Sequence, residues 1–159
     1  EGYKRQGEVC SVGAPGAVEA PDGVEVVDGT GLHLFPAFAD PHVHVRSPGQ
    51  EHKETLATGT ASAAAGGYCA VLAMPNTNPV LDSAPLLRSL FEEAARSARI
   101  PLGFVPAITR GMNGQELTEM AELRDAGAAG ADDHRVELAP GPVVRKMVEH
   151  FGHLKLSRE

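Results

Sequence analysis

From residue 35 onward, short apolar runs alternate with longer segments whose apolar positions recur every three or four residues. The segments predict helices over 53–65, from Asp82 or Ser83 to about Ala98, over 114–126 and over 142–151. Strand–helix alternation at this spacing predicts βαβ units and a parallel sheet, and continuously apolar strands predict burial on both faces. The runs that we interpret as strands are AFADPHVHV, YCAVLAMPNT, PLGFVPAIT and AAGADD, and residues 154–156 would begin a fifth strand.

The first 35 residues show another pattern, rich in valine and glycine. Short stretches such as Val24–Asp28 and Leu32–Phe35 lie between the turn signals PDG and DGTG. We predict small β-strands here. The expected organisation is therefore an N-terminal β segment over 1–35 and an α/β domain over 36–159.

Composition narrows the class of protein. A chain of 159 residues with 42% hydrophobic and 22% charged residues can bury the core of one ordinary domain. Its net charge of −7, without a Lys/Arg cluster, argues against a nucleic-acid partner. No apolar run is long enough to span a membrane. Two cysteines, Cys10 and Cys69, are too few for a disulfide framework, and we expect Cys69 to be a buried, reduced thiol in a cytoplasmic protein.

The most informative stretch is ADPHVHVRSPGQ, which places His42, His44 and Arg46 on alternate positions of an apolar run. In a regular strand these three side chains project to the same side. Two imidazoles together suit zinc, and the guanidinium suits bidentate capture of a carboxylate. A chance HxH without a metal is the alternative, and the position at the end of a βα strand favours the site.

Other strand ends add candidates. Asn76, in MPNTNP, lies where it could bind a ligand, although an ordinary Asn/Pro turn is the favoured interpretation of the motif taken alone. Asp132 and Asp133 close the fourth run, as site residues or as acids of a loop or helix cap. We expect the remaining histidines and the late lysine to be structural or solvated: His33, His52, His150, His153 and Lys155.

Four motifs in order, HVHxR, PGQEHKE, AMPNTNP and a late DD, strongly resemble the dihydroorotases of the amidohydrolase superfamily over roughly residues 20–150. The resemblance implies a (β/α)8 TIM-type barrel beside a small β-sandwich, with about four βα units in this chain. It also implies a centre with two zinc ions that interconverts dihydroorotate and N-carbamoyl-L-aspartate in de novo pyrimidine biosynthesis.

Carried over residue by residue, the resemblance implies that His42 and His44 are metal ligands and that Asp133 bridges the two metals, with Asp132 as a non-ligating neighbour. Arg46 and Asn76 would bind the substrate carboxylate, and His44 would also lie against the substrate. The implied partners are a small-molecule substrate, aspartate carbamoyltransferase and, in the complete form, further copies of the same chain.

The sequence departs from the family pattern in three ways. Ser47 stands where glutamate is usual, and His134 replaces glycine after a strand that is one residue short, a slip that could turn Asp133 to the other side. The resemblance also implies two further histidine ligands and an acid/base aspartate on later strands. We therefore expect a truncated barrel that lacks a catalytic acid/base and is inactive in isolation.

Two alternative functions stay open. A hydantoinase or allantoinase would share the chemistry, but its substrates lack the carboxylate that Arg46 would hold. A non-catalytic dihydroorotase-like subunit that scaffolds aspartate carbamoyltransferase is the other. Such subunits typically lose metal ligands, whereas His42, His44 and Asp133 are present here.

Overall fold

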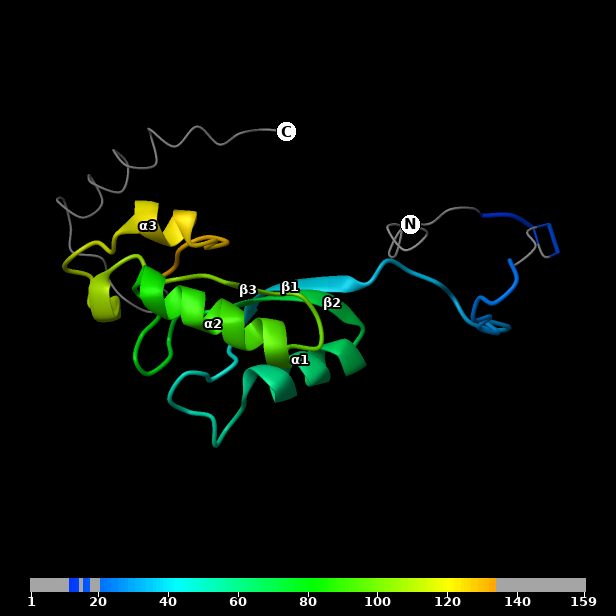
Figure 1. The fold of residues 1–159 in the computed structure, drawn as a ribbon, viewed down its shortest axis with the longest axis horizontal. Coiled ribbons are helices and arrows are strands. Elements are labelled where there is room, and N and C mark those ends of the chain that lie inside the picture. Colours follow the sequence, from blue (N-terminus) through cyan, green and yellow to red (C-terminus); the bar gives the residue numbers. More distant parts are fainter. Residues whose placement is uncertain (1–11, 15, 18–20, 134–159) are drawn as a thin grey trace. The chain divides into compact units, whose positions relative to one another are not determined.

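The computed structural model describes residues 12–14, 16–17 and 21–133, and the chain divides between Phe35 and Pro36 into two units. The strands of the second unit form a parallel sheet in the order β1-β2-β3, which confirms the predicted α/β class (Figure 1). The elements are β1 (Phe38–Val43), α1 (Leu56–Ala65), β2 (Tyr68–Ala73), α2 (Ala84–Ser97), β3 (Leu102–Phe104), the 3-10 helix η1 (Arg110–Met112) and α3 (Met120–Asp125).

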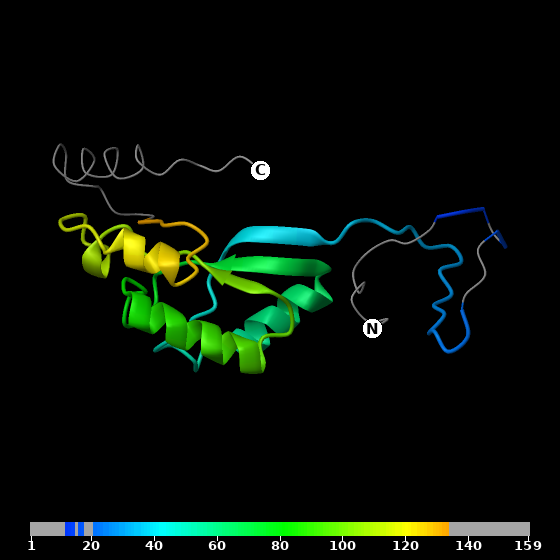
Figure 2. The same ribbon diagram turned by 45° about the horizontal axis from the view of Figure 1, so that its top comes forward.

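Helices α1 and α2 lie on the same face of this sheet (Figure 2). The core forms between them and the strands, and Phe91 of α2 meets Phe104 of β3 edge to face with 5.0 Å between ring centroids. The fully buried members of this core include Leu56, Leu81, Leu87 and Phe104.

The prediction that the strands are buried on both faces is wrong. Every residue of β1 is exposed or half-buried, and Cys69 of β2 is exposed, which also corrects the expected burial of that thiol. Since α1 and α2 cover one face, strand side chains turned away from these helices stay accessible. Within the described residues, no helix is long and apolar enough to cross a membrane.

Local signals explain where the first two helices begin. Thr55 caps α1 through a reciprocal capping box with Thr58, so the helix starts three residues after the predicted Lys53. Ser83 is the N-cap of α2, as expected, and a proline occupies its first turn. The boundaries of both helices otherwise follow the sequence pattern closely.

The predicted third helix over 114–126 is wrong in its first half. Thr109 and Leu117 form an antiparallel bridge, and the Thr118 hydroxyl donates to the carbonyl of Ala107 at 2.9 Å. These contacts fold residues 110–118 back as a loop that contains η1. The helix itself is confined to α3, which ends before Gly127.

Residues 128–133, the predicted fourth strand, are not assigned as a strand. They nevertheless run beside β3 and its extension, because the N–H groups of Ala129 and Asp132 donate to the carbonyls of Phe104 and Pro106, both at 2.9 Å. The helix predicted over 142–151 and the strand start over 154–156 lie outside the described residues.

The strands predicted at Val24–Asp28 and Leu32–Phe35 are absent from the first unit as described over residues 21–35. This segment forms turns, and its apolar side chains are exposed, from 50% at Val24 to 98% at Leu34. A strand requires a neighbour for its backbone N–H and C=O groups. An apolar alternation alone does not create one.

Candidate functional site

The candidate residues gather along one edge of the sheet. The strands are parallel, so their carboxyl ends meet at the same edge, and the following loops carry the polar side chains. His42 lies near the end of β1 and His44 follows it, Asn76 follows β2, and Asp133 ends the segment beside β3. The fold therefore brings the predicted strand ends together, as the βαβ interpretation requires.

His44 and Asn76 are in direct contact across the first two strands. The Nδ1 atom of half-buried His44 lies 2.7 Å from Oδ1 of Asn76. An amide oxygen only accepts, so Nδ1 carries the proton and the lone pair of the neutral ring lies on Nε2. Metal-binding histidines are commonly oriented by such a hydrogen bond from their other ring nitrogen.

His42 lies beside this pair. The rings of His42 and His44 are edge to face, with centroids 5.2 Å apart. The carboxylate of Asp40 accepts from the backbone N–H of His42 at 3.0 Å, at an irregularity of the β1–β2 ladder between Asp40 and Val43. The two imidazoles thus come close together, although not through a regular strand.

The alternate-position argument for Arg46 is wrong, because β1 ends at Val43 and the backbone of Arg46 is left-handed, with φ of 51°. Strand geometry therefore does not dictate that Arg46 projects with the two histidines. Arg46 lies half-buried in a turn, where its carbonyl accepts from the N–H of Gln50 at 3.0 Å.

The loops after β1 and β2 pack tightly on each other. The N–H of Asn78 donates to the carbonyl of Pro48 at 3.0 Å, and a Cβ added to Gly49 would lie 1.8 Å from the carbonyl oxygen of Asn78. Only glycine permits this approach. Sequence analysis also missed that Ser47 is 1% exposed, with a hydroxyl that has no hydrogen-bond partner among the described residues.

Asp133 is buried and its carboxylate binds the loop after β3. Oδ1 accepts from the N–H of Ile108 at 2.8 Å, both oxygens accept from the N–H of Thr109 at 3.0–3.1 Å, and the Thr109 hydroxyl donates to Oδ2. These bonds show that Asp133 holds the loop after β3, and they do not decide between the two interpretations that the sequence left open. Thr109 itself carries no signal in the sequence that would have identified it.

Two imidazoles and a buried carboxylate at neighbouring strand ends fit zinc in donor chemistry. Across the part of the chain that the structure describes, however, no three His, Cys, Asp or Glu side chains come close enough to hold a metal ion together. His42 and His44 are neighbours, while Asp133 is held by its loop. Within the described residues, these side chains therefore do not form a closed metal site.

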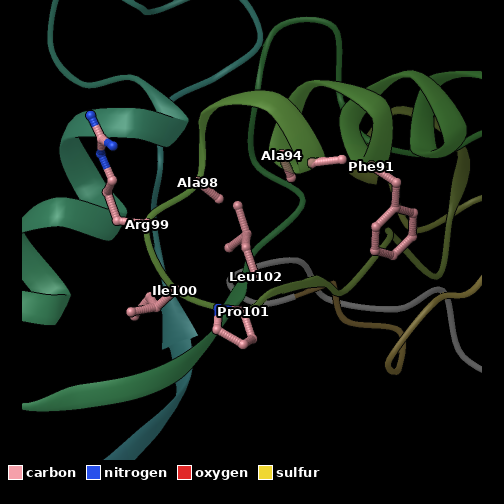
Figure 3. A pocket seen from close by; sticks show the side chains of 8 residues that line it. Phe91, Ala94, Ala98, Arg99, Ile100, Pro101 and Leu102 are labelled. Carbon is pink, nitrogen blue, oxygen red and sulfur yellow. The ribbon is translucent and has the colours of Figure 1, made fainter. Parts of the chain in front are cut away.

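Two surface hollows bear on the candidate site, one apart from its residues and one lined by His44. An apolar hollow of about 430 Å³ separates the end of α2 from the start of β3, lined by residues such as Phe91, Ala98 and Leu102 (Figure 3). It contains none of the predicted site residues and opens at the amino end of the strand. A second hollow of about 280 Å³ includes His44, together with the carboxylates of Asp40 and Glu54.

Two further histidines lie within the described residues. His33 is exposed and its ring centroid lies 6.2 Å from that of Phe35, and His52 is exposed in the loop before α1. The remaining candidates from the sequence lie outside the described residues: Cys10, His134, His150, His153 and Lys155.

Comparison with known proteins shows the family of this chain. Residues 31–153 match the family described as dihydro-orotase-like. A dihydroorotase of Geobacter sp. (strain M21) is 40% identical over 131 residues, 82% of this chain and 31% of the relative. One of Sulfurihydrogenibium sp. (strain YO3AOP1) is 42% identical over 132 residues, with 83% and 31% covered. The chain spans about a third of the length of these curated relatives.

A solved structure is similar in fold. L-hydantoinase (dihydropyrimidinase) from Arthrobacter aurescens superposes with a TM-score of 0.61 over 74% of this chain and 27% of that chain. The sequence identity is 17%, so this likeness concerns the fold alone.

Proposed function

This chain belongs to the dihydro-orotase-like family, and on that premise we propose that it supplies the first strands of a zinc-dependent cyclic amidohydrolase. The reaction is the interconversion of dihydroorotate and N-carbamoyl-L-aspartate in de novo pyrimidine biosynthesis. The strands would be the first of a (β/α)8 barrel, with residues 1–35 contributing to a β-sandwich. The observation that carries the proposal is the His44–Asn76 hydrogen bond beside His42.

The proposed metal ligands are His42, His44 and Asp133, in a centre for two zinc ions. Zinc supplies Lewis acidity, which activates water near neutral pH and polarises an amide carbonyl. The chain's own contribution is orientation: the Asn76 oxygen fixes the tautomer of His44, and the loop after β3 holds the carboxylate of Asp133. Further ligands and the acid/base aspartate would come from later strands, which the roughly threefold longer relatives have room for.

Arg46 and Asn76 are the proposed anchors for the substrate carboxylate. Because Oδ1 of Asn76 faces the ring of His44, its amide nitrogen is the atom suited to donate to an anion. A guanidinium adds two parallel hydrogen bonds to the same group. This arrangement would favour dihydroorotate over hydantoin or allantoin, which lack that carboxylate, and the reacting amide would then lie close to His44.

A second candidate function is a non-catalytic subunit that holds aspartate carbamoyltransferase, in which the hydrogen bonds of Asp133 would serve its loop alone. Zinc content separates the enzyme from the non-catalytic subunit, because only the enzyme requires zinc ions in its centre.

Two further proposals rest on the family alone: a cytoplasmic location and homo-oligomerisation of the complete form.

The test is complementation. The 159-residue chain is co-expressed with the C-terminal two thirds of the Geobacter dihydroorotase, and the pair is assayed for zinc and for opening of dihydroorotate, hydantoin and allantoin. We expect zinc and dihydroorotate opening in the pair and neither in the chain alone. His42→Ala should abolish both, whereas His33→Ala, also at an exposed histidine, should change neither.

Arg46 is tested in the same pair. Arg46→Ala should raise KM for dihydroorotate more than tenfold while zinc content is kept, because a carboxylate contact is lost and no metal ligand is touched. Arg88→Ala, on the exposed side of α2, is the control. Preferred opening of hydantoin would contradict the substrate proposal, and a zinc-free pair that co-purifies with aspartate carbamoyltransferase would favour the non-catalytic subunit.

A further inference from the structure

We propose that Thr109 is a positioning residue that sets the carboxylate of Asp133 for metal binding, an inference that rests on the proposed function of Asp133. The two residues are 24 positions apart and belong to different loops at the carboxyl edge of the sheet. Thr109 is fully buried and Asp133 is 6% exposed. A hydrogen bond between them is therefore shielded from water and determines the carboxylate's orientation.

The direction of the Thr109 hydroxyl bond follows from its second partner. The N–H of Gly114 donates to the Thr109 Oγ1 at 2.9 Å, so that oxygen acts as an acceptor there. A hydroxyl has one proton, and Asp133 is the acceptor that receives it. The chain Gly114 N–H, Thr109 O–H, Asp133 carboxylate therefore runs in one direction, and each bond polarises the next.

The arrangement leaves Asp133 able to bind a metal. A carboxylate offers about four lone-pair sites. Three donor protons engage these sites, from the N–H groups of Ile108 and Thr109 and from the Thr109 hydroxyl, and the Thr109 N–H is shared between both oxygens. Some capacity for a cation remains, and the two backbone donors and the hydroxyl together restrict the side chain to one orientation.

Pre-orientation of this kind has a measurable consequence. A ligand that is already fixed loses less conformational freedom when the metal binds. Partners that orient a metal ligand typically change metal affinity by about 10–100-fold when they are removed. Thr109 would thus act on zinc through Asp133 without touching the metal itself.

Thr118 provides a matched control in the same loop. It is 6% exposed, and its hydroxyl donates to the carbonyls of Ala107 at 2.9 Å and Ile108 at 3.1 Å. Replacing either threonine by valine removes one buried hydroxyl from the loop after β3. Only the change at Thr109 removes a bond to Asp133, so a general effect on the loop appears in both variants.

The experiment measures zinc affinity in the complemented pair by competition with a chelator, and the visible spectrum after cobalt substitution. Thr109→Val should weaken zinc binding by about 10–100-fold and alter the cobalt spectrum. Thr109→Ser, which keeps the hydroxyl, should stay within about threefold of the parent, as should Thr118→Val. If the valine variant does not fold, Thr109→Ala and Thr118→Ala make the same comparison.

Equal zinc affinities for the Thr109 and Thr118 variants would overturn the inference. So would a loss in Thr109→Ser as large as in Thr109→Val. Failure of the proposed function is a separate result: the parent pair would then bind no zinc or leave dihydroorotate unopened. A parent pair that binds zinc and opens the ring, with a Thr109→Val variant of unchanged affinity, rejects the role of Thr109 alone.

Discussion

Residues 21–35 and residues 36–133 are both built from short apolar runs separated by glycine and proline turns, yet only the second region forms a sheet. Leu34 is 98% exposed in the first region, whereas Leu56 is fully buried in the second. The difference lies in what packs against the apolar runs of each region. Runs in the second region alternate with helices that pack on them, and runs in the first region have turns on either side.

Local hydrogen bonds form in both regions and do not account for the difference. In the first region, the N–H of Leu32 donates to the carbonyl of Gly29 at 2.9 Å, as in an ordinary turn. Ordering a residue's backbone costs about 1–2 kcal/mol, which a turn hydrogen bond does not offset. Burial against α1 and α2 offsets it in the second region.

The largest test of this contrast uses two phenylalanines. Phe104 is 1% exposed and packs edge to face on Phe91, whereas Phe35 is 73% exposed. Phe104→Ala should lower the free energy of unfolding by about 3–5 kcal/mol, because it removes buried area and leaves a cavity. Phe35→Ala should change it by less than about 0.5 kcal/mol. Urea titration of the 159-residue chain measures both.

If Phe104→Ala does not fold, Phe104→Leu gives the same comparison at about 1 kcal/mol. A loss at Phe35 that equals the loss at Phe104 would contradict the contrast. It would mean that the first region has a buried partner after all.

Two left-handed glycines give the next largest difference. A Cβ on Gly49, at φ of 92°, would meet the carbonyl oxygen of Asn78, whereas one on Gly23, at φ of 80°, would meet nothing within 4 Å. Gly23→Ala should cost only the left-handed conformation, about 1 kcal/mol. Gly49→Ala should cost about 1–3 kcal/mol more, since two loops must separate.

Thermal unfolding of the two glycine variants measures this difference. An NMR spectrum should also show shifts at Asn76 and His44 for Gly49→Ala and not for Gly23→Ala. Equal costs would show that the loops after β1 and β2 are not interlocked.

The sequence-based prediction succeeded where local signals determine the structure and failed where contacts between distant residues do. Helices α1 and α2 were predictable because Thr55, Ser83 and the helical spacing are local signals. The parallel sheet was predictable from the βαβ alternation. The first half of the predicted helix over 114–126 failed, because the bridge to Thr109 and the Thr118 bond to Ala107 join residues about ten positions apart.

In the candidate site, the positions of the residues were predictable and their side-chain contacts were not. The sequence placed His42, His44, Asn76 and Asp133 at strand ends, and the fold brings those ends to one edge. It could not predict that Asn76 orients His44 or that Thr109 holds Asp133, since neither contact has a local sequence signature. The orientation of side chains between strands depends on backbone irregularities, such as that between Asp40 and Val43, which apolar patterns do not encode.

The smallest expected effect concerns two exposed carboxylates, one in each region. Hydrogen bonds from the hydroxyl and the N–H of Thr30 lower the pKa of Asp28 below its ordinary value. Its own N–H and that of Gly49, with a smaller contribution from His52, lower the pKa of Glu51. A lowered pKa means that each turn is stabilised above the ordinary pKa and loses that contribution as the pH falls through the lowered value.

Carboxyl titration by NMR should therefore give midpoints below the ordinary values for both groups. Thr30→Val should raise the midpoint of Asp28, because the hydroxyl bond is the larger cause, and should leave that of Glu51 unchanged. An unmoved Asp28 midpoint would mean that its turn does not form. Midpoints lowered in both regions would show that both form local turns. Together with the different losses of unfolding free energy for Phe104→Ala and Phe35→Ala, they would show that the regions differ in burial.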